Sequence, residues 1–156
     1  MENYLKKRPP KKVFPTDLVE SLKNKAIEKI KSKFLPDDKI IKIILIGSAV
    51  KNPFGEYKPP GFRESLYSDF DFIMFVENDY IIPKWLKKEP DGKPFPDDAL
   101  NFAYRNKKFI EDKYDVEVFF IKRKNMTDPK IQKSGELAGI PMTAKSKHKH
   151  LVVYSK

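Results

Sequence analysis

Two runs of consecutive hydrophobic residues, at 43–46 and 72–76, form the strongest pattern in the chain. Both runs are short and rich in Ile, Leu, Phe and Met, and polar or turn-forming residues bound them. Such runs are typical of strands buried on both faces, as in a sheet with helices against it. The sequence therefore predicts two core strands, at about 39–46 and 69–76.

A third strand is predicted at 114–121, where acidic and hydrophobic residues alternate before an entirely hydrophobic end. The C-terminal part is weakly patterned, with a short helix predicted at about 129–138 and a last strand at 150–154. Residues 51–67 and 77–96 are rich in Pro and polar residues, which predicts loops.

Hydrophobic residues recur at the helical period between Leu18 and Phe34, and lysines cover the other faces. This pattern predicts a core-docking helix at about 16–36. A second long helix is predicted at about 97–113, with an aspartate as its cap. Its hydrophobic positions are Leu100, Ala103, Phe109 and Ile110.

These elements predict an α/β (α+β) fold, with a short mixed sheet, helices packed on one face and a pocket on the other. The 156 residues are 40% hydrophobic and 13% aromatic, which suits one folded domain. Residues 1–14 are rich in Lys and Pro and are interpreted as a basic arm. Residues 15–156 are interpreted as the single domain.

The composition says more about where the protein is found than about what reaction it catalyses. The chain has no cysteine, which excludes disulfides and thiolate metal sites, and no hydrophobic run approaches the roughly 20 residues of a membrane span. A cytoplasmic protein is therefore expected. The net charge of +10 favours polyanionic partners, although a lysine-rich solubilising surface explains it equally well. Abundant Lys, Glu, Ile and Pro also resembles the usage of thermophile proteins.

Candidate chemistry begins with Asp69 and Asp71. Residues two apart in a strand share a face and lie roughly 6.6–6.8 Å apart, so these carboxylates repel each other unless a cation lies between them. Mg²⁺ prefers such oxygen ligands, and two-metal sites for phosphoryl transfer use bridging carboxylates. The simpler interpretation is an exposed edge strand that happens to begin with two acids.

A second pair of acids strengthens the metal hypothesis. Asp115 and Glu117 again share one face of a predicted strand and interrupt a hydrophobic run. Either could complete a three-acid site, and both are kept as candidate metal ligands. We favour Glu117 as the third catalytic acid, because a carboxylate deeper in a hydrophobic strand has the greater need of a cation.

Gly47 and Ser48 follow the first predicted strand directly. A glycine there lets the backbone come close to a ligand, and N–H groups at a helix or turn beginning at Ser48 would face an anion. The combination of hydrophobic strand, Gly-Ser, Asp-x-Asp and a later acidic strand resembles the nucleotidyltransferase superfamily that includes DNA polymerase beta, in particular its minimal nucleotidyltransferase members. The resemblance covers roughly residues 18–121.

The resemblance implies transfer of a nucleoside monophosphate from a nucleoside triphosphate, most readily ATP, with pyrophosphate leaving. Two Mg²⁺ ions would be bound by the acids. The residues implied in nucleotide binding are Gly47, Ser48, Lys51 and Ser68. The acceptor hydroxyl stays open among RNA, protein and small molecule.

The chain departs from the family pattern in two respects. The segment between Ser48 and Asp69 is longer than usual and lacks the arginine that often follows Gly-Ser, with Lys51 as the nearest cation. Two other functions therefore stay open. The chain could be a non-catalytic, antitoxin-like module with a helical partner protein, or a basic nucleic-acid-binding domain.

Overall fold

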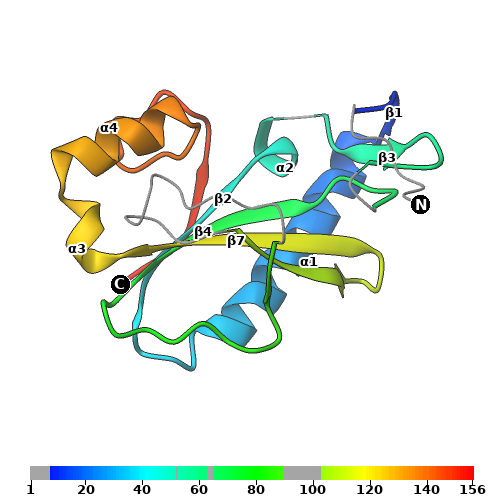
Figure 1. The fold of residues 1–156 in the computed structure, drawn as a ribbon. Helices are drawn as coiled ribbons and strands as arrows, with labels where there is room; N and C mark the ends of the chain where they lie inside the picture. Colours follow the sequence, from blue (N-terminus) through cyan, green and yellow to red (C-terminus); the bar gives the residue numbers. More distant parts are fainter. Residues whose placement is uncertain (1–7, 52, 63–64, 90–102) are drawn as a thin grey trace.

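The computed structural model describes residues 8–51, 53–62, 65–89 and 103–156, and a six-stranded mixed sheet forms its centre (Figure 1). In spatial order the strands of this sheet are β5 (Lys87–Lys88), β6 (Tyr104–Ile110), β7 (Tyr114–Lys122), β4 (Phe70–Val76), β2 (Ile40–Ile46) and β8 (Leu151–Ser155). The helices are α1 (Thr16–Phe34), α2 (Ser48–Lys51), α3 (Arg123–Met126) and α4 (Pro129–Leu137). This content confirms the predicted α/β class.

Most of the elements expected from the hydrophobic pattern are confirmed. The predicted strands correspond to β2, β4, β7 and β8, and the predicted helices at 16–36 and 129–138 correspond to α1 and α4. The helical period of α1 produces one buried stripe, made of Val19, Leu22, Ala26, Ile30 and Phe34. None of the described helices has the length and apolarity that a bilayer crossing requires.

Strand β4 lies at the centre, between antiparallel β2 and parallel β7. In this register Asp71 is opposite Ile46 of β2 on one side and opposite Glu117 of β7 on the other. Paired residues of neighbouring strands project to the same face of a sheet. The register therefore brings the second Asp-x-Asp carboxylate next to Glu117 and close to the end of β2.

The face of the sheet that carries α1 holds the larger core. Alternate residues of β4, from Phe70 to Val76, pack there with the buried stripe of α1. Phe120 of β7 is fully buried in this cluster, with its ring 6.3 Å from Phe34 and 5.5 Å from Tyr80.

The opposite face holds a second, smaller cluster at one end of the strands. Its buried residues are Ile44, Ile73, Phe75, Ile121, Ile140 and Met142. Ile131 of α4 packs against them. Helices therefore cover both faces of the sheet, whereas the sequence predicted helices on one face only. Asp71 and Glu117 lie on the same face as this smaller cluster, beyond it and toward the starts of β4 and β7. The sheet therefore separates α1 from the carboxylates.

The predicted helix at 97–113 is wrong in its described part, because residues 104–110 form β6, an antiparallel partner of β7. Hydrophobic residues are too sparse there to define a helical face, and the edge of β7 offers backbone partners to a strand. Lys108 and Glu111 have φ of 56° and 52°, which a helix does not allow. The expected caps and one expected core position, Asp97, Asp98 and Leu100, lie outside the described residues.

The described part of the basic arm is attached to the domain. Its β1 (Lys11–Val13) pairs with β3 (Gly55–Tyr57), which lies inside the segment expected to be a loop. Phe14 follows β1, and its ring lies 6.1 Å from Phe54 and 6.5 Å from Tyr67. The described parts of the arm and of the 51–67 segment therefore form one small layer beside the starts of β4 and β7.

Candidate functional site

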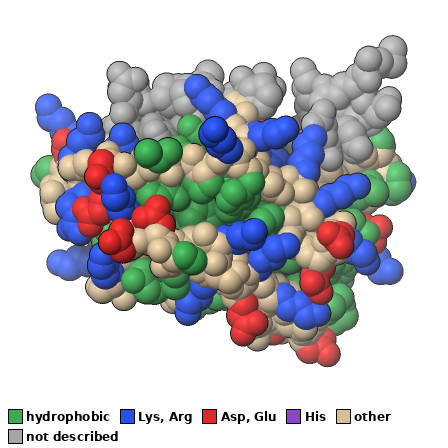
Figure 2. Space-filling view, turned by 90° about the horizontal axis from the view of Figure 1, so that it is seen from below, with side chains coloured by type: hydrophobic (Ala, Val, Ile, Leu, Met, Phe, Trp, Pro, Cys, Tyr) green, Lys and Arg blue, Asp and Glu red, His purple; other side chains and the backbone are tan. Residues whose placement is uncertain are grey.

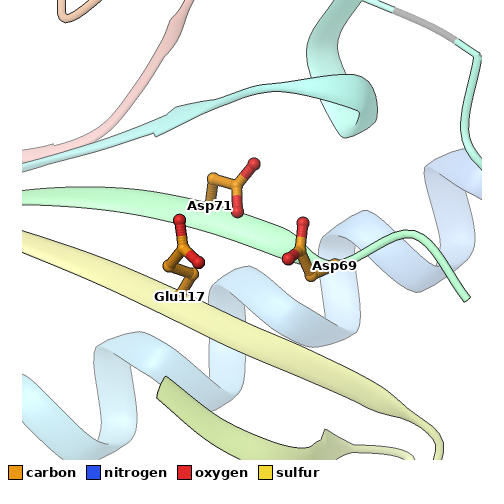
Figure 3. A group of neighbouring side chains, drawn as sticks. All are labelled: Asp69, Asp71 and Glu117. Atoms are coloured by element: carbon orange, nitrogen blue, oxygen red, sulfur yellow. The ribbon is translucent and has the colours of Figure 1, made fainter. Parts of the chain in front are cut away.

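Three carboxylates converge at the start of the central parallel pair. Asp69 and Asp71 come from the entry to β4 and from β4 itself, and Glu117 comes from β7 (Figure 3). One oxygen of each side chain lies within 4.8 Å of the others, and all three side chains are partly buried. Figure 3 shows the three carboxylates pointing toward one another above the sheet. The fold thus brings together three acids that the sequence analysis placed on two neighbouring strands.

Gly47 belongs to the same site. It ends β2 with φ of +81°, a conformation that favours glycine. A Cβ at this position would collide with the Asp71 carboxylate, whose Cγ would lie only 3.3 Å away. The glycine therefore lets the backbone at the end of β2 approach Asp71 directly.

The other residues expected to bind nucleotide differ in their surroundings. Ser48 begins α2, and Lys51 is exposed at the end of this helix. Neither residue is among those that line the pocket at the three acids. Ser68 is buried, and its hydroxyl accepts a hydrogen bond from the Gly55 amide at 3.1 Å. Ser68 thus holds β3 against the entry to β4, a contact that positions the neighbouring Asp69.

Asp115 takes a separate place from the three converging acids. Its Oδ1 accepts a hydrogen bond from the Lys108 amide at 2.9 Å, and its Oδ2 lies 3.1 Å from Nη1 of Arg105. The side chain is only 4% exposed. Of the two candidates for the third acid, Glu117 therefore joins Asp69 and Asp71, while Asp115 faces β6.

Arg105 of β6 is the central cation of the site. Its guanidinium pairs with Asp69 at 3.1 Å, with Asp115 at 3.1 Å, with Glu117 at 2.5 Å and with Glu89. Only 11% of its side chain is exposed. Burial alone would lower the pKa of Arg105, but the nearby carboxylates of Asp69 and Glu117 raise it above its ordinary value.

The carboxylates outnumber this single guanidinium, and the pKa values of two of them, Glu117 and Asp71, are raised. Burial, reinforced by the Asp69 charge, raises the pKa of Glu117 to about 7 despite the opposing effect of Arg105. Burial, followed by the charges of Asp69 and Glu117, raises the pKa of Asp71 well above its ordinary range. In both groups, burial and the neighbouring like charges disfavour the charged form by more than Arg105 stabilises it.

An aromatic and basic wall completes the pocket above the acids. Its members are Arg8, Tyr57, Phe62, Ser65 and Tyr67. The Arg8 guanidinium lies 5.4 Å from the centre of the Phe62 ring. Residues 1–14 were expected to form a basic arm and residues 51–67 a loop, but neither pattern singled out these residues.

Comparisons of the chain with protein-family models, with curated proteins and with solved structures give no significant match. The functional argument therefore rests on the chain's own residues. Its central observation is the convergence of Asp69, Asp71 and Glu117 beside Gly47.

Proposed function

We propose that this protein is a metal-dependent nucleotidyltransferase, which moves a nucleoside monophosphate from a nucleoside triphosphate to an acceptor hydroxyl. The observation that carries the proposal is that Asp69, Asp71 and Glu117 offer oxygens within 4.8 Å of one another. The order of Gly47-Ser48, Asp-x-Asp and a third acid along the chain, which resembles the superfamily pattern, supports it further.

The three acids fit a divalent metal by their chemistry. All the donors are carboxylate oxygens, which Mg²⁺ and Mn²⁺ prefer over nitrogen or sulfur ligands. Asp71 forms no ion pair with any Lys or Arg of the described residues, and burial and the charges of Asp69 and Glu117 raise its pKa, so a bound cation would stabilise its charged form. Asp69, Asp71 and Glu117 would therefore hold the metal, with two Mg²⁺ ions as the expected number.

The reaction would form a bond between the acceptor oxygen and the α-phosphorus and break the bond from that phosphorus to the bridging oxygen. Pyrophosphate leaves with the electron pair, and the hydroxyl proton passes to solvent. Bound Mg²⁺ would neutralise charge on the transferring phosphate. The chain's part is positional: its acids fix the reacting centre, and Gly47 leaves the backbone close to it without a side chain. ATP is the first nucleotide to test, and RNA, protein and small-molecule acceptors all suit the proposal.

The test compares wild type with Asp69→Asn and Asp71→Asn. Calorimetric titration with ATP and Mg²⁺ measures binding, and pyrophosphate release measures transfer. We expect metal-dependent ATP binding in wild type and a loss of about a hundredfold or more in transfer rate in each variant. Asp79→Asn is the matched control, because Asp79 is 73% exposed and pairs with Lys39 far from the site. Equal ATP binding in all four proteins would contradict the proposal.

A non-catalytic module is the second candidate, and the contacts of Arg105 favour it. A guanidinium that pairs with four carboxylates reduces their mutual repulsion without any metal. In that case the protein would act through a partner, such as a helical protein. Its complex would survive Asp69→Asn, as size-exclusion chromatography of the co-expressed pair would reveal.

Binding of nucleic acid through charge alone has weaker support. On the face that carries α1, Figure 2 shows Lys and Arg interspersed with Asp and Glu around a hydrophobic centre, with no continuous basic surface. Three of the described lysines also pair with acids, namely Lys23, Lys25 and Lys39. This function predicts salt-dependent RNA or DNA binding that Asp69→Asn leaves unchanged.

A further inference from the structure

Arg105 shares two carboxylates with the proposed metal site. Its Nη2 lies 3.1 Å from Oδ2 of Asp69 and 2.5 Å from Oε2 of Glu117. The other two nitrogens of the same guanidinium pair with acids outside the converging three: Nη1 lies 3.1 Å from Asp115, and Nε pairs with Glu89. Two nitrogens are therefore held by acids outside the converging three, and Nη2 is held by two of the three.

A bound metal would compete for only one of these two sets of contacts, the one that Nη2 makes. Asp115 and Glu89 are not among the converging acids, so a metal held by those three would not compete for their contacts with the guanidinium. Asp69 and Glu117, in contrast, are partners of Arg105 and are also proposed ligands of the metal. Mg²⁺ requires close octahedral ligands at about 2.0–2.1 Å, and a divalent cation repels a guanidinium that shares its carboxylates.

We propose that Arg105 is a positioning residue that competes with the divalent cation for Asp69 and Glu117 and thereby couples metal binding to nucleotide binding. This inference rests on the proposed function. In the metal-free protein Arg105 supplies the positive charge between the two acids. Metal entry requires Nη2 to give up these contacts, while Asp115 and Glu89 keep the guanidinium at the pocket that it lines.

The released Nη2 then faces the pocket as a charged donor without its carboxylate partners. Phosphate oxygens suit a guanidinium better than any other group the substrate offers. A triphosphate supplies oxygens for both the metal and Nη2, so each ligand relieves the cost of binding the other. Metal and nucleotide therefore raise each other's affinity by the same factor, as thermodynamic linkage requires.

The opposite role for Arg105 predicts the opposite sign. A residue that orients metal ligands through their remaining oxygens strengthens metal binding, and its removal typically weakens affinity 10–100-fold. A competitor weakens metal binding, and its removal strengthens it. The direction of the change in metal affinity thus decides between the two roles.

The experiment is calorimetric titration of Mg²⁺, and of Mn²⁺ as a tighter probe, into the full chain without nucleotide. The variants are Arg105→Gln, Arg105→Lys and the control Arg123→Gln. Arg123 also belongs to an arginine–carboxylate pair, with Glu77 at 2.7 and 2.8 Å, but at the far end of β7. We expect about tenfold tighter metal binding in Arg105→Gln, a smaller gain in Arg105→Lys and no change in Arg123→Gln.

A second titration, with a non-hydrolysable ATP analogue present, measures the coupling. Wild type should gain metal affinity on adding the analogue, and Arg105→Gln should gain at least fivefold less. Thermal unfolding in EDTA shows whether each variant is folded, and Arg105→Lys serves as the test if Arg105→Gln is not.

The outcomes separate this inference from the proposed function. Weaker or unchanged metal affinity in the Arg105 variants overturns the competitor role, even if transfer activity is found. Tighter metal binding with no transfer activity supports the competitor role and contradicts the transferase. Absence of metal binding in every variant overturns both.

Discussion

Gly47 makes room for the site through the backbone rather than through a side chain. Its φ of +81° and the nearby Asp71 carboxylate impose two separate demands, one on conformation and one on space. Gly139 has nearly the same conformation, with φ of +89°, but no atom within 4 Å of where a Cβ would lie. Substitutions at the two glycines therefore distinguish the cost of backbone strain alone from the cost of strain combined with a steric clash.

Gly47→Ala is expected to abolish metal binding as well as lower stability, because the new methyl group must displace Asp71. Gly139→Ala is expected to cost only the strain of a left-handed residue, about 1–2 kcal/mol, and to leave metal binding intact. Urea unfolding measures the free energy, and Mn²⁺ titration measures the site. Equal metal affinity in the two variants would show that the approach of Gly47 to Asp71 is not needed.

Glu117 predicts a pH dependence of stability in the metal-free protein. Its folded pKa, about 7, lies above its ordinary value of 4.5, so folding favours the protonated form. This contribution is complete below pH 4.5 and is lost as the pH rises through about 7, on the order of 3 kcal/mol in all. The raised pKa of Asp71 acts in the same direction.

Unfolding in urea with EDTA, repeated between pH 5 and pH 8.5, measures this dependence. Wild type should lose stability across that range, and Glu117→Gln should lose less because it cannot ionise. A wild-type profile that is flat, or that rises with pH, would contradict the assignment.

At the scale of elements, the hydrophobic pattern was sufficient wherever one element is buried by many partners. The runs in β2 and β4 and the stripe of α1 were predicted because burial alone determines them. β6 was not, because its residues are partly exposed and its strand geometry comes from pairing with β7. The sequence of a partly exposed strand carries little record of the strand that it pairs with.

The residues of the site differ in the same way in how far the sequence predicts them. Asp69, Asp71 and Glu117 were predicted because each stands next to a hydrophobic run. Arg105 was missed because it lies in the segment predicted as a helix, where it does not interrupt a hydrophobic run as the acids of the site do. Its role depends on cross-strand pairing with Glu117, which no local pattern contains.

The pairing of β1 with β3 depends on Gly55. A Cβ there would collide with the Lys12 carbonyl oxygen and come within 3.0 Å of Cα of Val13. Gly55→Ala should therefore detach the arm and expose Lys11 and Lys12 to trypsin. Mass spectrometry after brief digestion measures cleavage, with Gly139→Ala as the control. Equal cleavage of the arm in both variants would indicate that this pairing does not hold it.

For the whole molecule, stability resides mainly on the face of the sheet that α1 covers. Phe120→Ala removes a fully buried ring there and should cost about 3–5 kcal/mol. Ile81→Ala, at a position that is 84% exposed, should change stability by less than about 0.5 kcal/mol. Urea midpoints compare the two, and similar losses would contradict this view of the core.

The pairing of Arg105 with Glu117 has a consequence for the order of folding. β6 and β7 are neighbours in the sequence and form a local hairpin, whereas β4 and β7 join distant parts of the chain. Local pairs form with less loss of chain entropy. The hairpin therefore reaches β4 with its own positive charge already in place, and Asp69 meets a guanidinium as well as another carboxylate. Without Arg105, closing the central sheet would require bringing like charges together.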